Sequence, residues 1–193
     1  HAVNAVEAAA KVIARISGLA DEQRDSGLRL DGFDVPYTTA AVCLVGGGIA
    51  DNVVPEDCRF TYEVRNLPGV DPEGLHRQVL ADARRLEPAM QAVDPTTGFR
   101  FEAITEMPAF RVPESDPAVR LGLKLAGARR TTHVAFGTEA GIFQGAGMST
   151  VVCGPGSITQ AHQADEFVSL EQLAACERFL RGITQDGAAF LGG

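Results

Sequence analysis

The order of hydrophobic patterns along the first half of the chain constrains its fold more than any other feature. Apolar residues recur at helical spacing over residues 3–18, and an apolar run of strand length follows at 38–45. Alternating residues at 60–65 predict a half-buried strand, and an aspartate followed by a proline begins a predicted helix over 71–86. A last alternation at 99–103 predicts another strand. With one strand added in front, this order becomes βαββαβ, a ferredoxin-like split sheet with its helices on one face.

A different pattern begins beyond Pro113. An Asp-Pro pair at 116–117 predicts the start of a helix, and short β-rich runs follow at 132–136 and 150–153. The residues at 169–172 form a capping box, which predicts a final helix. The apolar residues expected on its inward face are Leu173, Cys176, Phe179, Leu180 and Ile183. This second segment is typical of the last part of an α/β layer whose earlier strands are absent.

The composition narrows the class of partner. With a formal net charge of −8, the chain has no basic stripe to neutralise phosphates, so we expect a small-molecule partner and no nucleic acid. No apolar run approaches the roughly 18 residues of a membrane-spanning helix, which argues against a membrane partner. The cysteines have no CxxC spacing, which predicts reduced, buried thiols in a cytoplasmic protein: Cys43, Cys58, Cys153 and Cys176.

The most chemically suggestive stretch is a glycine-rich loop, Gly154-Pro155-Gly156-Ser157, that leads to His162. A histidine after such a loop can approach a metal closely, and Asp165 or Glu166 can orient its second ring nitrogen. A lone histidine is more often a hydrogen-bonded structural residue, so both interpretations stay open. His76, inside a predicted helix, is predicted to be a solvated surface residue.

Arg65 and Asn52 are candidate substrate ligands. The Arg65 guanidinium can clamp a carboxylate through two parallel hydrogen bonds, or it can pair with Glu63 on the same face of the strand. Asn52 lies in a predicted turn, where its amide can bind a substrate or satisfy its own backbone. Gly154 and Gly156 can present backbone N–H groups to an anion or simply form a tight turn. The residues alone leave each of these alternatives open.

Several motifs together resemble a known family. Asn-Val-Val-Pro at 52–55 and Glu-Val-Arg at 63–65 resemble the lid strand of the dinuclear zinc aminoacylase and carboxypeptidase family. Leu-Pro-Gly at 67–69, Thr-Glu-Ala at 138–140 and the stretch at 154–166 resemble the acetylornithine deacetylase branch of that family. The resemblance covers essentially the whole chain. In most relatives outside this branch, an aspartate stands where this chain has Glu139.

The resemblance implies a catalytic α/β domain interrupted by a ferredoxin-like lid that pairs into a homodimer. The lid, lacking its first strand, would occupy residues 1–112, and residues 113–193 would be the C-terminal part of the catalytic domain. Two zinc ions are implied, with cobalt as an alternative metal, and His162 would be the last metal ligand. The implied substrate-binding residues are Asn52, Arg65, Glu139, Gly154, Gly156 and Ser157. Among them, Glu139 would contact a cationic substrate amine.

The remaining metal ligands and the general base of that family lie upstream of this chain, so the resemblance implies no catalytic residue within it. Because His1 immediately precedes the first predicted helix, we expect a fragment of a longer enzyme that is inactive alone. The implied reaction removes the acetyl group of N-acetyl-L-ornithine, in arginine biosynthesis, through a metal-bound water. The alternatives are a related desuccinylase or aminoacylase, and a dimerisation or binding module without catalysis.

Overall fold

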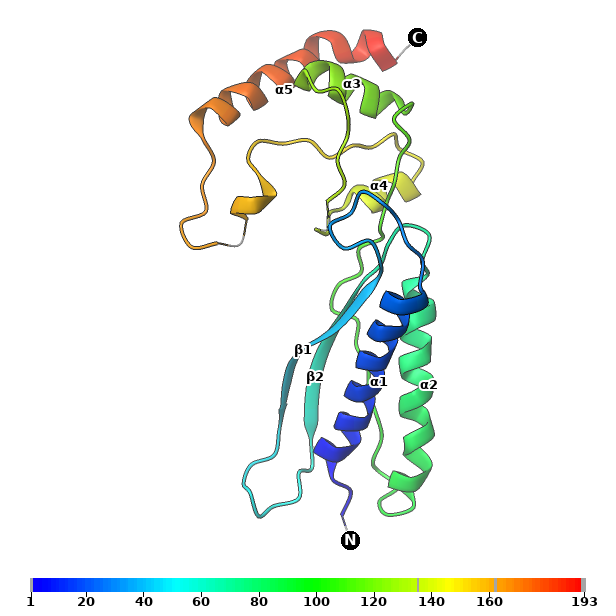
Figure 1. Cartoon of the computed structure of the whole chain (residues 1–193). Coiled ribbons are helices and arrows are strands. Elements are labelled where there is room, and N and C mark those ends of the chain that lie inside the picture. Colours follow the sequence, from blue (N-terminus) through cyan, green and yellow to red (C-terminus); the bar gives the residue numbers. More distant parts are fainter. Residues whose placement is uncertain (1, 135, 162, 192–193) are drawn as a thin grey trace. The chain divides into compact units, whose positions relative to one another are not determined.

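The computed structural model of the 193-residue chain describes residues 2–134, 136–161 and 163–191. Two compact units divide the chain, His1–Glu106 and Met107–Gly193, here called the first and second units. The first unit contains α1 (Ala5–Ser26), β1 (Thr39–Gly47), β2 (Cys58–Arg65) and α2 (Pro72–Gln91) (Figure 1). The second unit contains α3 (Pro117–Ala126), α4 (Ala140–Gly145), the 3₁₀ helix η1 (Ile158–Gln160) and α5 (Leu170–Leu191). None of the described helices is both long and apolar enough to span a lipid bilayer.

Local sequence determines where the first two helices begin. The Asn4 side chain accepts a hydrogen bond from the Glu7 N–H at 3.1 Å, and this N-cap starts α1. Pro72 occupies the first turn of α2, where its missing N–H costs no helical hydrogen bond. Both helices therefore begin close to their predicted positions. They run further than predicted, to Ser26 and Gln91.

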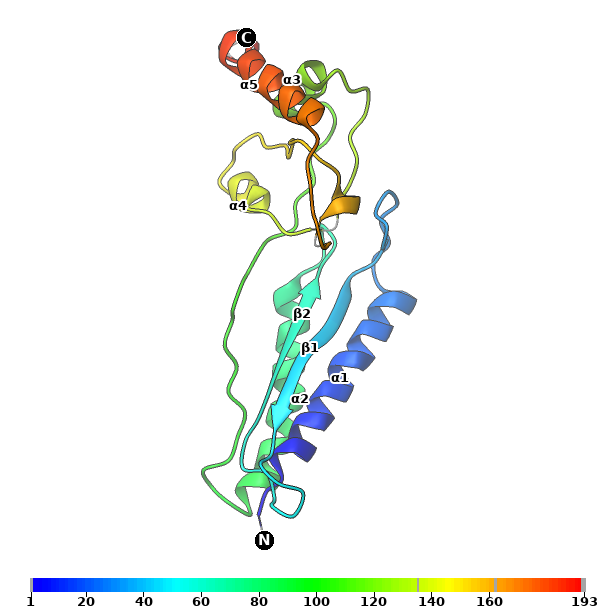
Figure 2. The ribbon, with the colours of Figure 1, turned by 90° about the vertical axis from the view of Figure 1, so that its left-hand side faces the viewer.

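β1 and β2 form a two-stranded antiparallel sheet. Thr39 lies opposite Arg65 at one end of this hairpin, and Gly47 lies opposite Cys58 at the other. A bulge within β1 interrupts the register near its middle. α1 and α2 lie against the same face of the hairpin (Figure 2). The first unit is therefore a layer of helices on a hairpin.

The core of the first unit lies between these two layers. Val12, Ile16 and Leu19 from α1 meet Val79 and Ala83 from α2, and all are at most 3% exposed. A spacing of three or four residues places each group on one stripe of its helix. Apolar side chains from one face of the hairpin close the core: Ala40, Val42, Phe60 and Tyr62.

The strand predicted over 99–103 is wrong: no strand is assigned to these residues. Phe99 and Phe101 do pack against the core, so the alternation indicated one buried face correctly. Instead of joining a sheet, the Phe99 N–H donates to Glu87 Oε1 of α2 at 3.0 Å. A strand needs a hydrogen-bonded neighbour, and no described strand pairs with this segment. The described residues thus form a two-stranded sheet, and the ferredoxin-like arrangement stays a prediction.

His76 is not the solvated surface residue that the sequence predicts. It is half-buried on α2, and its Nδ1 is hydrogen-bonded to the Tyr62 hydroxyl. The two rings stack with their centroids 6.1 Å apart, and Phe101 makes an edge contact with the imidazole at 5.9 Å. Burial raises the pKa of the Tyr62 hydroxyl, which keeps the hydroxyl protonated. The exposed polar residues that follow it, Arg77 and Gln78, gave no sign that the His76 side chain turns inward.

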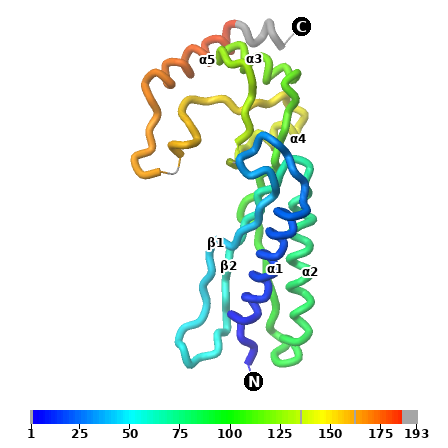
Figure 3. The backbone as a smooth tube through the Cα atoms, viewed as in Figure 1, coloured from blue at the N-terminus to red at the C-terminus, as the bar shows by residue number. Residues whose placement is uncertain are grey.

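The second unit is built around two packed helices (Figure 3). The Asp116 carboxylate caps α3 by accepting a hydrogen bond from the Ala118 N–H at 2.9 Å. α3 packs against α5, where a Cβ on Gly182 would lie 2.6 Å from Leu125 Cδ2. The glycine therefore permits this close approach of the two helices. Val119 of α3, at 1% exposed, is among the most buried side chains of this unit.

The two β-rich runs of the second unit do not form strands. No strand is assigned to 132–134, to 136 or to 150–153, and Val152 is 44% exposed. The cause is again the lack of a hydrogen-bonded neighbour among the described residues. All four cysteines are free. Their predicted burial is wrong for Cys43 and Cys153, which are both exposed.

α5 begins as its capping box predicts, because Ser169 Oγ accepts a hydrogen bond from the Gln172 N–H at 3.2 Å. Its predicted inward face is only partly buried. Leu173, Leu180 and Ile183 are 44%, 55% and 39% exposed. The apolar stripe exists in the sequence, but α3 covers only part of it.

We expect Ile16→Ala to lower the free energy of unfolding of the first unit by about 2–5 kcal/mol, because it leaves a cavity at a side chain that is 1% exposed. The matched control is Ile49→Ala at a side chain that is 89% exposed, with an expected change within about 0.5 kcal/mol. Urea unfolding followed by tyrosine fluorescence measures this unit selectively, since the chain has no tryptophan and both tyrosines, Tyr37 and Tyr62, lie in it. Equal losses for the two variants would contradict the described core.

Candidate functional site

Arg65 is the last residue of β2 and is exposed at the end of the hairpin. Its Nε donates to Glu63 Oε1 at 2.9 Å, and its Nη2 donates to Glu63 Oε2 at 3.4 Å. These bonds raise the pKa of the guanidinium, so its positive charge is permanent. The structure thus contains the Glu63 pair that was one of the two interpretations. The Arg65 and Glu63 side chains are 60% and 47% exposed, so a solute carboxylate has access to the guanidinium.

Asn52 lies at the opposite end of the hairpin. It is exposed in the loop between β1 and β2, within a turn that the Val53 N–H closes by donating to the Ala50 carbonyl at 3.4 Å. Because a strand rises about 3.3 Å per residue, the length of β2 separates the two ends by roughly 23 Å. The Asn52 and Arg65 side chains of one chain therefore cannot contact the same small molecule.

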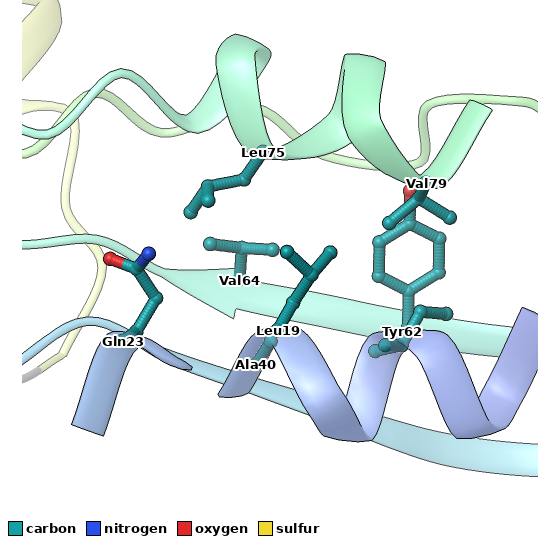
Figure 4. Close-up of a pocket in the computed structure, with 8 residues that line it drawn as sticks. Leu19, Gln23, Ala40, Tyr62, Val64, Leu75 and Val79 are labelled. Atoms are coloured by element: carbon teal, nitrogen blue, oxygen red, sulfur yellow. The ribbon is translucent and has the colours of Figure 1, made fainter. Parts of the chain in front are cut away.

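Two hollows of the first unit differ in whether a small substrate could fit into them. A cavity of about 10 Å³ lies in the core, lined by side chains that include Leu19, Tyr62 and Val64 (Figure 4). It holds no more than one water molecule, so it is not a substrate site. A hollow of about 340 Å³ is open to solvent in the loop between β1 and β2, where Val53 and Arg59 help to line it. This second hollow is large enough for a small molecule but lacks walls that enclose one.

The glycine-rich loop is held against the start of α5. The Gly156 N–H donates to Gln172 Oε1 at 3.4 Å, and the positive φ of 97° at Gly156 is one that other residues rarely adopt. Ser157 Oγ accepts from the Thr159 N–H at 3.3 Å and caps η1. The Gly156 N–H is therefore engaged within the protein, while Gly154 has open space around it and is exposed.

Glu139 precedes α4 and is exposed. Its side chain makes no cap hydrogen bond; the Thr138 hydroxyl accepts from the Ala140 N–H at 2.9 Å instead. The backbone carbonyl of Glu139 accepts from the Ile142 N–H at 2.9 Å, which fixes the first turn of α4. The carboxylate is thus available to a cationic group in solution.

The predicted metal ligand, His162, lies outside the described residues. Asp165 and Glu166 are described and exposed, and Asp165 has a φ of 61°. Within residues 2–134, 136–161 and 163–191, no group of three or more His, Cys, Asp or Glu side chains could hold a metal ion. Because a stable zinc site takes three or four protein ligands, these residues do not fit a complete metal centre.

Comparison with known proteins identifies the family of the chain, which the geometry alone does not. Residues 1–91 match a family model described as a peptidase dimerisation domain. The chain is 34% identical over 157 residues to an acetylornithine deacetylase of Myxococcus xanthus, which covers 78% of this chain and 38% of the relative. It is 34% identical over 169 residues to an acetylornithine deacetylase of Klebsiella pneumoniae (strain 342), which covers 86% of this chain and 42% of the relative. The chain belongs to the family of these deacetylases.

This membership confirms the resemblance carried by the motifs of both units. The peptidase dimerisation domain corresponds to the helices and hairpin of the first unit, from α1 to the end of α2. The matches to the deacetylases extend beyond it, because 157 and 169 residues exceed the length of the first unit. The chain spans about two fifths of the length of these relatives.

Sequence reasoning missed one residue that supports the candidate site. Gln172 was identified as part of a capping box, and in that motif its side chain bonds back to the helix start. In the structure its Oε1 accepts the Gly156 N–H instead. No sequence signal distinguishes these two uses of a glutamine, because the second depends on how a loop 16 residues earlier in the chain folds back onto α5.

We expect Gly156→Ala to loosen the glycine-rich loop, because a Cβ at a φ of 97° strains the backbone by about 1–3 kcal/mol. The matched control is Gly154→Ala, where an added Cβ meets nothing within 4 Å. Hydrogen exchange of the Thr159 and Gln160 amides reports on the loop, since both donate to Ser157. Exchange should be about tenfold faster in the Gly156 variant and unchanged in the control. Similar rates in both variants would argue that the loop conformation does not depend on the glycine.

Proposed function

We propose that the chain is part of a metal-dependent amide hydrolase that removes the acetyl group from N-acetyl-L-ornithine. The observation that carries this proposal is the 34% identity, over most of this chain, to two relatives that are both named acetylornithine deacetylase. Because the chain spans 38% and 42% of these relatives, the activity is proposed for the longer protein. The 193-residue chain alone is expected to be inactive.

The metal of this proposal is zinc, with cobalt as the alternative, because both ions accept imidazole and carboxylate ligands. His162 is the one ligand that we assign to this chain, and the others would come from the rest of the longer protein. The described residues form no metal centre by themselves, so no reaction step is assigned to them. We place the enzyme in the cytoplasm, where its free thiols would stay reduced.

Arg65 is proposed to bind the substrate carboxylate. N-acylation neutralises the α-amine of an amino acid but leaves its carboxylate, which a guanidinium can clamp with two parallel hydrogen bonds. Glu63, one partner of this guanidinium, is a weak competitor, because exposed ion pairs stabilise proteins by only about 0.2–1 kcal/mol. Charge-assisted hydrogen bonds to a bound substrate contribute more, about 1.5–3 kcal/mol each. We therefore expect a substrate carboxylate to compete with Glu63 for the guanidinium.

The second unit is proposed to supply the remaining substrate contacts. The exposed Glu139 carboxylate suits the side-chain ammonium of ornithine, and Gly154, Gly156 and Ser157 would form the floor beside the acyl group. This unit also exposes apolar side chains that an isolated domain would bury, including Phe143 at 49% and Phe167 at 62%. Such exposure supports residues 113–193 as part of a larger catalytic domain, with residues 1–112 as its lid.

The hairpin geometry supports a site assembled from two copies of the chain. Asn52 and Arg65 of one chain are too far apart to meet one substrate, so we propose that one copy contributes Asn52 and the other Arg65. The first unit is the proposed homodimer interface, in line with its match to a peptidase dimerisation domain. β1 pairs with β2 along one edge, and its apolar side chains Leu44 and Val45 are 69% and 65% exposed. A partner strand would satisfy the other edge of β1.

Arg65→Ala in the full-length enzyme should lower kcat/KM for N-acetyl-L-ornithine by about tenfold to a hundredfold, because charge-assisted hydrogen bonds to the substrate are lost. Arg65→Lys should recover part of this loss, since an ammonium lacks the planar fork. The control is Arg77→Ala, which removes another exposed, ion-paired arginine and should leave the kinetics unchanged. Metal content should be normal in all three variants and reduced only in His162→Ala. Wild-type kinetics for Arg65→Ala, or a loss of thermal stability alone, would contradict the assigned role.

A further inference from the structure

Thr38 is a buried polar residue of the first unit. Its side chain is 1% exposed, immediately before the start of β1. Its Oγ1 accepts a hydrogen bond from the Leu67 N–H at 3.1 Å. Leu67 is itself 4% exposed and lies two residues beyond Arg65, the end of β2. The bond therefore joins the two chain segments that leave the same end of the hairpin.

This side-chain bond holds the two segments together just beyond the last backbone pair of the sheet. The last pair of the register is Thr39 with Arg65, so the Leu67 N–H has no partner within the sheet. A buried N–H without an acceptor is costly, and the Thr38 hydroxyl provides that acceptor. The next turn has a separate support, because the Asn66 side chain donates to the Val70 carbonyl at 3.2 Å. The backbone at Arg65 is thus fixed on both sides, by the register before it and by Thr38 after it.

We propose that Thr38 is a positioning residue for Arg65, which holds the backbone at the end of β2 so that the guanidinium is presented in one orientation. The inference rests on the proposed function, in which Arg65 binds the substrate carboxylate. A bidentate clamp depends on orientation more than a point charge does, so a mobile strand end weakens substrate binding first. Thr38 touches neither the substrate nor the Arg65 side chain in this role.

The experiment compares two variants of Thr38 in the full-length enzyme with N-acetyl-L-ornithine. Thr38→Val keeps the branched shape but removes the acceptor, and KM should rise by about threefold to tenfold with little change in kcat. Thr38→Ser keeps the hydroxyl and should have a KM near the wild-type value. Hydrogen exchange of the Leu67 amide should be faster in Thr38→Val and normal in Thr38→Ser.

A double-mutant cycle separates positioning from general stability. In an Arg65→Ala background, Thr38→Val should have no further effect on KM, because the group that it positions is gone. An equal rise of KM in both backgrounds would overturn the proposal, and so would a fall in kcat alone. If Thr38→Val does not fold, a raised KM for Thr38→Ser overturns it too. If Thr38→Val has a normal KM while Arg65→Ala is impaired, only the positioning role of Thr38 is rejected. If Arg65→Ala has wild-type kinetics, the proposed clamp and the positioning role are both rejected.

Discussion

The hydrogen-bonded register of the β1–β2 hairpin is the constraint on which the rest of the first unit depends. By pairing Thr39 with Arg65 and Gly47 with Cys58, it sets one face of the hairpin against α1 and α2. A shift of one residue would turn Phe60 and Tyr62 away from the core, so burial maintains the register. The same register fixes the two candidate substrate ligands at opposite ends of the hairpin. The fold of the first unit thus limits how a substrate site can be built.

Local signals predicted the elements that depend on local interactions. The caps of α1, α3 and α5 and the first-turn proline of α2 are properties of neighbouring residues, so the sequence indicates where those helices begin. Strands depend on partners that the pattern does not reveal. Residues 99–103 have the alternation of a strand, and Phe99 and Phe101 turn one face to the core. Without a neighbouring strand among the described residues, the Phe99 N–H bonds to Glu87 instead.

The sequence selects the candidate residues, whereas their arrangement depends on the tertiary fold. Motifs identified Arg65, Asn52 and the glycine-rich loop, and the comparisons with acetylornithine deacetylases confirmed the family. The distance between Asn52 and Arg65, and the bond from Gly156 to Gln172, are tertiary facts that spacing along the chain does not contain. The roles of the individual residues remain proposals that rest on chemistry. A guanidinium suits a carboxylate, an exposed carboxylate suits an ammonium, and an imidazole suits zinc.

The central claim is that each substrate site takes Asn52 from one chain and Arg65 from the other, and subunit complementation tests it most directly. Asn52→Ala and Arg65→Ala versions of the full-length enzyme, each impaired alone, are mixed under conditions that exchange subunits. A hybrid dimer then contains one site with both substitutions and one with neither, so random exchange should restore about a quarter of wild-type activity. Activity that stays at the average of the two impaired variants would contradict the shared site.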